Sequence, residues 1–400
     1  MSASSLAARF PLLDFDAYHR GDLPGRLADG RGRRAARDLG ERAPLSFQVP
    51  DGRAYRYVPA GDTVTVAAGT EGADVIVGLT ADDFSALVHE LHTPAGLFYG
   101  GRLAFLTGSF PALERWEPAL RALWSGRPIF DREALDLRAR DGSALDPSRD
   151  FARDASDDEL RHFLHEAGYL VVRRVFSPEE VTRLSAAADG LAAAARPGDR
   201  RSWWARTRAG EEVCCRVTYA SLRDQTIAAL SDDARLRRLG ALAGPGLRPG
   251  PDRCDGHSLV IKHGDVAEGL ADLPWHRDCG LGGHPVMCPN IQLGIQLDAA
   301  TPETGRLHFL AGAWRASCHR REFERPDGLP IVAVDTEPGD VTVHFGDTLH
   351  AAPPPTAPGR GRRALYVSFF SPPTFELIPR EHGYNDVFIG RDDGLVVAGS

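Results

Sequence analysis

Several features that would assign this chain to a broad class of protein are missing from its sequence. No CxxC pair occurs among the six cysteines, and Cys214 and Cys215 are adjacent, so a disulfide framework is not indicated. No apolar run approaches the length of a membrane-spanning helix. Residues 1–22 contain early acidic residues and no sustained apolar stretch of the kind found in secretory signals. We therefore expect a cytoplasmic protein without a transmembrane segment.

Positive charge is also scarce relative to negative charge. The chain has 47 Lys and Arg against 55 Asp and Glu, and its net charge of −8 leaves no basic stripe for nucleic acid. Arginine greatly outnumbers lysine. Hydrophobic residues make up 42% and charged residues 26% of the 400 positions, which is ordinary for a soluble globular protein. The length favours two or three domains.

Residues 1–130 are expected to form an α+β domain, because strand-like and helix-like patterns alternate along them. Residues 46–58 predict a hairpin that turns at Asp51-Gly52. Thr80 is predicted to cap a helix, since acidic residues follow it in the position of a first helical turn.

The rest of the chain is predicted to be a linker followed by a strand-rich domain. Residues 131–157 are polar, carry many charges and include Gly142 and Pro147, as expected of a linker. Residues 158–400 begin with a helix–strand–helix pattern, whose second helix starts at Ser177. Short strands separated by Gly and Pro turns then dominate, which indicates an antiparallel sandwich or barrel.

His276 and Asp278, in the sequence His-Arg-Asp, form the most informative motif. On a β-strand, residues i and i+2 project from the same face, so the imidazole and the carboxylate can both reach one ion. His350, predicted to end a distant strand, adds a second imidazole. Two imidazoles and one carboxylate occupy one face of an octahedron around Fe(II) and leave the opposite positions open for a co-substrate and O₂. The set predicts an oxygen-activating enzyme.

A second motif of the same form, His263-Gly264-Asp265, has to be judged on equal terms, because a single short motif is weak support. Gly264 lies where a strand would be weakened, and a loop follows, so His263 and Asp265 are predicted to be structural. His344 precedes His350 by six residues and has the same strand parity. We expect His344 to line a cavity or to pack, rather than to bind metal.

The ordered series of motifs resembles the phytanoyl-CoA dioxygenase (PhyH-like) family of Fe(II)- and 2-oxoglutarate-dependent oxygenases, over roughly residues 158–370. The segment LHEAGYLVVRRVFSPEEV is similar to the helix–strand–helix that opens that family's domain. The resemblance implies a double-stranded β-helix (jelly-roll, cupin-like) with flanking helices. It also implies that His276, Asp278 and His350 are the catalytic iron ligands. Halogenating relatives replace the carboxylate by a small residue, so Asp278 argues against halogenation.

The resemblance further implies a co-substrate arginine eleven or twelve residues beyond the distal histidine. Arg362 fits, and a guanidinium can bind the distal carboxylate of 2-oxoglutarate bidentately. Adjacent strand residues face opposite ways, so only one of Arg362 and Arg363 points inward, and Arg362 is preferred. Lys262 is a second candidate for cofactor binding because it could pair with a carboxylate, although the default expectation for a lysine is a solvated surface position. Gln292, a third candidate, lies on the polar face of the strand over 290–297, which either lines the cavity or is an exposed face over an apolar core.

Residues from about 40 to 125 resemble a sterol-carrier-protein-like domain, on the segment ADVIVGLTADDFSALVHELHTPAGLFYGGRLAFLTGSFPALERW. That family has an α+β fold with an apolar tunnel for acyl chains or sterols. The alternative is a degenerate domain used for dimerisation, which would make the chain a homodimer, or for shaping the neighbouring site.

The leading functional hypothesis is a dioxygenase that uses Fe(II), 2-oxoglutarate and O₂ to hydroxylate a small or lipid-like organic substrate or a specialised metabolite. With the same cofactors, desaturation, epimerisation or cyclisation is the alternative outcome. A hypothesis of another class is a non-catalytic carrier for a lipid or small molecule, with a vestigial barrel.

Overall fold

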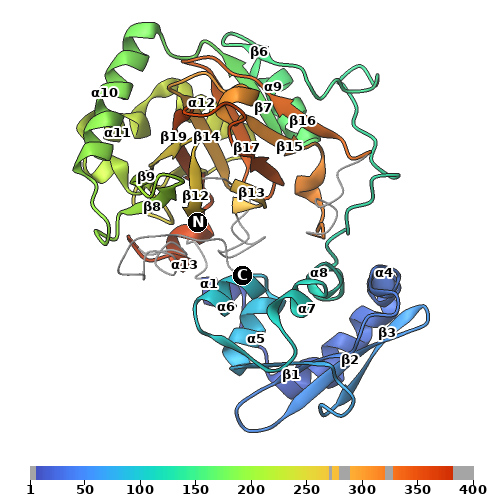
Figure 1. Ribbon diagram of the computed structural model, residues 1–400. Coiled ribbons are helices and arrows are strands. Elements are labelled where there is room, and N and C mark those ends of the chain that lie inside the picture. The colour runs from blue at the N-terminus through green and yellow to red at the C-terminus, as the bar shows by residue number, and fades with distance from the viewer. Residues whose placement is uncertain (1–5, 270–272, 279–288, 320–327, 382–400) are drawn as a thin grey trace. The chain divides into compact units, whose positions relative to one another are not determined.

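The computed structural model describes residues 6–269, 273–278, 289–319 and 328–381. The chain divides into two compact units (Figure 1). Unit 1 comprises Met1–Asp131, Cys279–Val286 and Arg315–Arg325, and unit 2 comprises Arg132–Asp278, Met287–Trp314 and Pro326–Ser400. No helix in the described part of the chain is both long enough and apolar enough to cross a membrane.

Unit 1 combines helices with a five-stranded sheet in the order β3-β2-β1-β4-β5. Its strands are β1 (Leu45–Gln48), β2 (Ala54–Ala60), β3 (Thr63–Ala68), β4 (Val75–Leu79) and β5 (Leu103–Thr107). The predicted hairpin is confirmed as β1 and β2, with Gly52 at a φ of 91°. Strand β4 pairs parallel to β1, so the chain crosses over after β3. The helices are α1 (Leu6–Arg9), α2 (Phe15–Ala17), α3 (Leu23–Arg26), α4 (Gly32–Leu39), α5 (Ala81–Val88), α6 (Pro94–Tyr99), α7 (Phe110–Glu114) and α8 (Glu117–Trp124).

Aromatic side chains fill the core of unit 1. The ring of Phe84, from α5, packs edge-on against Phe15 at 4.9 Å and against Phe47 at 5.5 Å between ring centroids. Edge-to-face pairs of this kind add to the stabilisation that burial of the rings provides. The largest fully buried side chains of this unit are Phe15, Tyr18, Phe47, Tyr57, Phe84 and Trp116.

Unit 2 is built from a large and a small sheet, in which almost all neighbouring strands are antiparallel. The large sheet runs β12-β8-β9-β11-β19-β14-β17-β7-β6, with β10 also on β19, and the small sheet runs β13-β18-β15-β16. Tyr169 of β7 stacks on Phe309 of β15 at 4.4 Å between ring centroids, so the two sheets face each other. The strands of the large sheet are β6 (Phe151–Ala152), β7 (Tyr169–Arg173), β8 (Ser202–Thr207), β9 (Glu212–Val217), β10 (Arg248–Pro249), β11 (Ser258–Lys262), β12 (Val266–Gly269), β14 (Ile291–Gln296), β17 (Val341–Phe345) and β19 (Arg362–Phe370); those of the small sheet are β13 (Leu273–His276), β15 (Leu307–Leu310), β16 (Ile331–Val334) and β18 (His350–Ala352).

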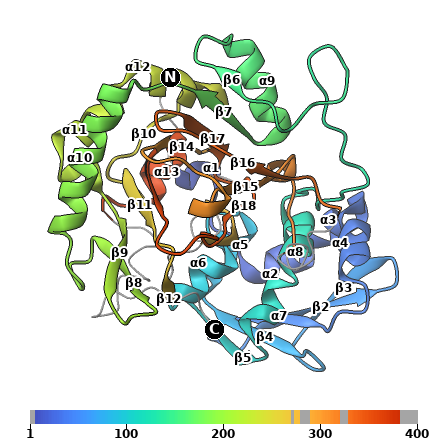
Figure 2. The same ribbon diagram turned by 45° about the horizontal axis from the view of Figure 1, so that its top comes forward.

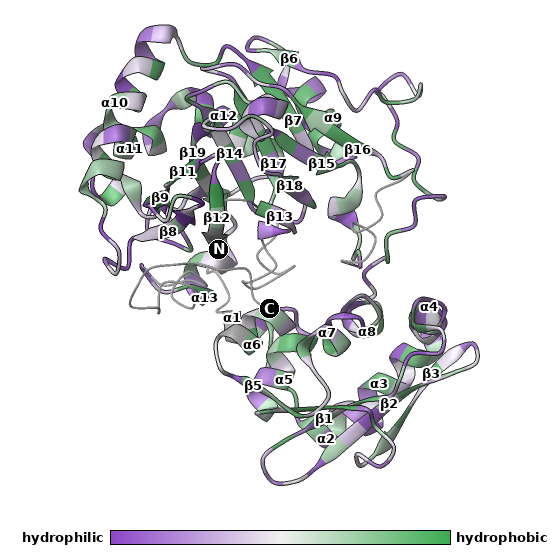
Figure 3. Cartoon of the chain, viewed as in Figure 1, coloured by the Kyte–Doolittle hydropathy of each residue, from purple (hydrophilic) through white to green (hydrophobic). Residues whose placement is uncertain are grey.

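Helices cover the outer face of the large sheet (Figure 2). They are α9 (Asp157–Ala167), α10 (Pro178–Ala194), α11 (Gln225–Ala228) and α12 (Ala234–Gly240), and α13 (Pro372–Leu377) follows the last strand. In Figure 3 the central strands are largely hydrophobic, whereas α10 carries many hydrophilic residues. This contrast is expected of a sheet whose helices face solvent on their outer side.

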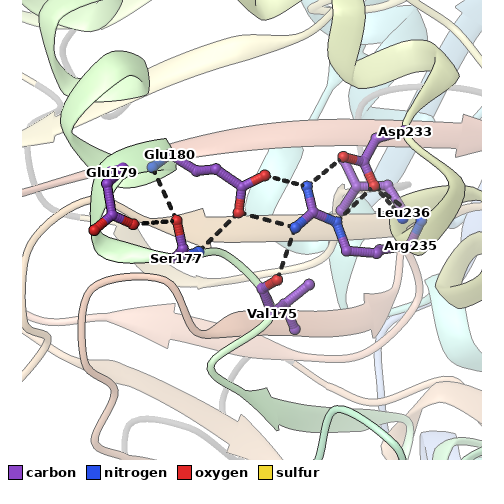
Figure 4. A network of polar contacts seen from close by, with 7 residues as sticks. All are labelled: Val175, Ser177, Glu179, Glu180, Asp233, Arg235 and Leu236. Carbon is purple, nitrogen blue, oxygen red and sulfur yellow. Dashed lines mark hydrogen bonds and ion pairs between the residues drawn. The ribbon is translucent and has the colours of Figure 1, made fainter.

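The start of α10 is fixed by the predicted cap and by an ion-pair network (Figure 4). Ser177 and Glu180 form a capping box, in which the Ser177 hydroxyl accepts from the Glu180 backbone and the Glu180 carboxylate accepts from the Ser177 backbone. Arg235 of α12 then donates to both oxygens of Glu180, at 2.9 and 2.8 Å, and to Asp233. The network ties α10 to α12 across the outer face of the sheet.

Two segments differ from the predicted domain plan. Residues 131–157 were predicted to be a linker; all of them beyond Asp131 lie in unit 2, where β6 pairs with β7 and the Tyr169 hydroxyl donates to the Pro147 carbonyl at 2.7 Å. The segment Arg315–Arg325 belongs to unit 1, although its neighbours in sequence belong to unit 2. Ser317 accepts from the Phe130 backbone at 2.7 Å and donates to the Pro128 carbonyl at 2.8 Å. These contacts are long-range, so no local sequence pattern could have indicated them.

Candidate metal centre

The pairing of β13 with β18 brings the two predicted ligand histidines together. His276, the last residue of β13, is the cross-strand partner of His350, the first residue of β18, and their ring centroids lie 4.2 Å apart. Asp278 follows two residues after His276. The prediction that a strand ends at His350 was wrong: β17 ends at Phe345 and a turn leads into β18. His344 and His350 therefore lie on different sheets.

Backbone carbonyls fix the orientation of both imidazoles. His276 Nδ1 donates to the carbonyl of Pro274 at 2.7 Å, and His350 Nδ1 donates to that of Thr348 at 2.9 Å. The proton on Nδ1 leaves the lone pair on Nε2 in each ring, which is the form that binds metal. The two Nε2 atoms lie 3.6 and 3.8 Å from Asp278 Oδ1. The Nε2 lone pairs of both histidines are therefore available to an ion that Asp278 Oδ1 also contacts.

The three side chains satisfy the geometry of a shared ion. One ligand atom from each of His276, Asp278 and His350 lies within 4.8 Å of the other two, and no other group of three or more His, Cys, Asp or Glu in the described chain meets this criterion. A carboxylate and two imidazoles at this spacing suit Fe(II) in an oxygenase. The residues present therefore fit an iron ion.

The electrostatics favour the metal-binding forms of Asp278 and His350. Burial opposes ionisation of Asp278, but the three imidazoles that surround the carboxyl hold its pKa well below its usual value. Burial lowers the pKa of His350 well below the ordinary histidine value. The carboxylate is thus ionised and the His350 ring neutral near pH 7.

Strand β14 places its polar residues on the inner face of the large sheet. Gln292 pairs with His344 of β17, and its Oε1 accepts from the Ser368 hydroxyl at 2.5 Å. Gln296 is fully buried, and the apolar residues that alternate with the glutamines belong to the main core cluster. Neither face of β14 is therefore an exposed surface. Gly294 is required between the glutamines, because a Cβ there would meet Thr342 Oγ1 at 2.6 Å.

Arg362 and Lys262 lie side by side on the same inner face. They are cross-strand partners on β19 and β11, and they are 3% and 2% exposed. Lys262 is the only lysine of the chain, and its Nζ donates to the carbonyl of Ala352 in β18 at 2.6 Å. The alternative of a solvated surface position was therefore wrong, because the aliphatic stem runs inward from β11. Arg362 Nε donates to the carbonyl of Gly305 at 3.0 Å, and its Nη1 lies 3.5 Å from Gln296 Oε1.

The turn at Gly305 closes over these two cations. Gly305 has a φ of 77°, and a Cβ at this position would lie 2.5 Å from Lys262 Cε. Only glycine allows the turn to approach so closely. Arg363 points the other way, where Asp298 accepts from its Nε and Nη2 at 2.8 and 2.9 Å. Of the two arginines, Arg362 faces the interior.

The second His-x-Asp motif has backbone partners instead. The His263 ring donates from Nε2 to the Cys214 carbonyl at 2.9 Å, and Asp265 accepts from the Gly359 amide at 3.1 Å. Both side chains thus hold loops to their neighbours, as predicted. Two further residues lie in the interior: Gln296, on the polar face predicted for the strand over 290–297, is the amide beside Arg362, and His344, which was expected to line a cavity or to pack, makes an unpredicted contact with Asp278 at 3.1 Å.

The site and fold define a non-haem iron oxygenase, and sequence comparison agrees. Residues 164–364 match the family described as phytanoyl-CoA dioxygenase (PhyH), and the chain belongs to this family. It is therefore an oxidoreductase that depends on iron, 2-oxoglutarate and O₂, and its second unit is a double-stranded β-helix. No curated protein matches the sequence.

Several solved structures are distantly similar. AviO1 from Streptomyces viridochromogenes Tue57 is 23% identical, covering 54% of this chain and 96% of its own, with a TM-score of 0.45. The non-haem α-ketoglutarate-dependent epimerase SnoN from nogalamycin biosynthesis is 21% identical over 54% of this chain and 80% of its own, with a TM-score of 0.44. EctD from S. alaskensis with bound Fe is 20% identical over 64% of this chain and 86% of its own, with a TM-score of 0.45. Because the sequence identities are only 20–23%, the reactions of those proteins cannot be assigned to this chain.

Proposed function

We propose that His276, Asp278 and His350 hold the catalytic iron and that the enzyme hydroxylates a small organic substrate. The observation that carries this proposal is the direction of the histidine lone pairs. Each ring uses Nδ1 on a carbonyl two residues earlier, and each Nε2 is left within 4 Å of Asp278 Oδ1. When bound, iron, 2-oxoglutarate and O₂ supply an oxidant for a substrate C–H bond and yield succinate and CO₂.

Arg362 and Lys262 are proposed to bind the distal carboxylate of 2-oxoglutarate. Two adjacent buried cations repel each other, and a carboxylate between them would offset this repulsion. Lys262 Nζ contacts the carbonyl of Ala352, which lies two residues beyond His350 on β18, or about 7 Å along the strand. That separation suits a five-carbon dicarboxylate whose other end is at the metal. Gln292, beside His344, lies at the metal end of β14, and Gln296 is the amide next to Arg362.

The substrate is proposed to carry hydrogen-bonding groups. The inner face of the large sheet presents Thr342, Ser368 and Tyr366 along with the two glutamines of β14, as the strand register shows. Arg216 of β9 lies opposite Val260 and shares this face, and it pairs with the buried Asp255. A substrate with hydrogen-bonding groups would match this polar lining better than a bare acyl chain, which could not hydrogen-bond to it.

Unit 1 is proposed to act as a structural domain, and not as a carrier of acyl chains. Six large aromatic side chains are fully buried in its core, and their rings pack against one another, as in the pairs of Phe84 with Phe15 and Phe47. A titration of the full chain with a fluorescent fatty acid tests this. Absence of saturable binding supports the structural role, and stoichiometric binding that unit 1 substitutions such as Phe84→Ala weaken would restore the sterol-carrier reading.

The reaction outcome can be tested by product mass. Candidate polar metabolites are incubated with the enzyme, Fe(II), 2-oxoglutarate and O₂, and succinate and products are measured by mass spectrometry. Hydroxylation predicts one product per succinate with a gain of one oxygen atom. A loss of two hydrogens would indicate desaturation or cyclisation, and an unchanged mass with succinate formation would indicate epimerisation. A carrier would bind the metabolite and form no succinate above an Asp278→Ala control.

A further inference from the structure

His344 occupies an unusual position for a buried histidine. It lies on β17 between two neighbouring strands, opposite Gln292 of β14 and Tyr169 of β7, and it is 1% exposed. Its side chain points from the large sheet toward the proposed ligands, of which His276 and His350 belong to the small sheet and Asp278 follows β13. It therefore reaches the centre from the opposite side of the barrel.

His344 contacts the proposed ligand Asp278 through the carboxylate oxygen that the two ligand histidines do not approach. His344 Nε2 lies 3.1 Å from Asp278 Oδ2, whereas His276 and His350 both approach Oδ1. An ionised carboxylate only accepts hydrogen bonds, so Nε2 of His344 carries a hydrogen and donates it. That nitrogen has no lone pair to offer a metal. The two oxygens of Asp278 thus have separate partners.

Packing holds the His344 ring in place. The ring centroid lies 5.4 Å from that of Phe309 and 4.5 Å from that of His350. Its other nitrogen, Nδ1, is buried without a hydrogen-bond partner among the described residues. The hydrogen bond to Asp278 is therefore the polar contact that gives this buried ring a fixed direction. A histidine that only filled space would be replaceable by an apolar side chain at lower cost.

We infer that His344 is a positioning residue, which holds Asp278 Oδ2 so that Oδ1 alone faces the metal. This inference rests on the proposed ligand set. A carboxylate that turned both oxygens to the ion would occupy a further coordination position, which an oxygenase needs for its co-substrate and O₂. Partners of ligand side chains commonly change metal affinity by about 10- to 100-fold when they are removed.

The test compares two amides that differ by one methylene group. In His344→Gln, the amide nitrogen can occupy the place of Nε2 and donate to Asp278. In His344→Asn, it stops near the place of Nδ1 and cannot. The probe is Co(II) added to the full-length apoprotein, with the dissociation constant measured by calorimetry and the visible Co(II) spectrum recorded for each variant. Circular dichroism and thermal unfolding show whether each variant is folded.

We expect His344→Asn to bind Co(II) about 10- to 100-fold more weakly than wild type and to change the Co(II) spectrum. We expect His344→Gln to stay within about threefold of wild type with an unchanged spectrum. Equal losses in the two variants, or no loss in either, would overturn the positioning role. His276→Ala serves as the reference: if it binds Co(II) as wild type does, the ligand set itself is wrong, and the proposed function falls with it.

Discussion

The two units use histidines in opposite ways. His19 of unit 1 donates from Nδ1 to the Phe15 carbonyl at 2.6 Å and accepts from the Tyr57 hydroxyl at Nε2, at 2.9 Å, while its ring stacks on Tyr55 at 4.0 Å. Both of its nitrogens are used within the protein. In unit 2, His276 and His350 each use one nitrogen on a carbonyl and leave the other beside Asp278. A structural histidine uses both ring nitrogens within the protein, whereas a candidate ligand leaves one nitrogen for a metal. This difference, more than burial, distinguishes the two.

The largest effect is expected from removing the carboxylate of the ligand set. Asp278→Ala should weaken Fe(II) binding by at least about 100-fold, because the two neutral imidazoles lose their only anionic partner. Anaerobic equilibrium dialysis measures this. The matched control is Asp265→Ala, in the second His-x-Asp motif, which should bind Fe(II) within about twofold of wild type because its carboxylate holds only a backbone amide. Similar losses of Fe(II) affinity in both variants would contradict the assignment of the metal site to the motif of His276 and Asp278.

The contribution of the structural histidine, His19, should be seen in the stability of the protein at acidic pH and not in metal binding. Burial lowers the pKa of His19 to about 4, from 6.5, although the Phe15 carbonyl and Asp16 oppose this. Below pH 6.5 the unfolded chain takes up a proton that the folded chain refuses until about pH 4. The contribution of His19 is thus present above pH 6.5 and lost as the pH falls towards 4, by roughly 3 kcal/mol.

Urea unfolding of the metal-free chain between pH 7 and 4.5 measures this loss. His19→Gln can keep a hydrogen bond but does not titrate, so its unfolding free energy should fall less over this range than that of wild type. Other buried histidines, such as His257, titrate in both proteins and cancel from the difference. Identical pH dependence in the two proteins would show that His19 does not titrate as its surroundings indicate.

A smaller effect is expected at the cofactor arginine. Arg362→Gln should weaken 2-oxoglutarate binding to the Co(II)-loaded protein by about 10- to 100-fold, since a charge-assisted pair contributes about 1.5–3 kcal/mol. Arg363→Gln is the control, because Arg363 is held by Asp298 on the other face and should leave this affinity unchanged. A larger loss in Arg363→Gln would reverse the assignment of the two arginines.

Local features of the sequence predicted much of this structure. The Thr80 hydroxyl accepts from the Asp83 amide and caps α5, and Ser177 caps α10. These features depend on a few neighbouring residues, whose preferences are strong. Strand parity predicted that only one of Arg362 and Arg363 points inward, and the family resemblance favoured Arg362. The ligand histidines were found by residue type and spacing, and their roles stay predictions until metal binding is measured.

Contacts between distant segments could not be predicted. Lys262 was assigned a surface position as its ordinary alternative, because no local pattern shows that β11 faces the interior. His344 was placed on the strand of His350, and its contact with Asp278 depends on two sheets that face each other. His319, which lies within the second domain in sequence, pairs with Asp38 of unit 1 at 2.5 Å. Each of these contacts joins segments more than 60 residues apart.

The central claim is that His276, Asp278 and His350 form one iron site that also receives 2-oxoglutarate. It is tested most directly by adding Fe(II) and then 2-oxoglutarate to the full-length protein without O₂ and recording the visible spectrum. The account predicts a weak charge-transfer band that appears only with both additions and is absent from His276→Ala. No band with the intact protein, or a band that persists in His276→Ala, would contradict it.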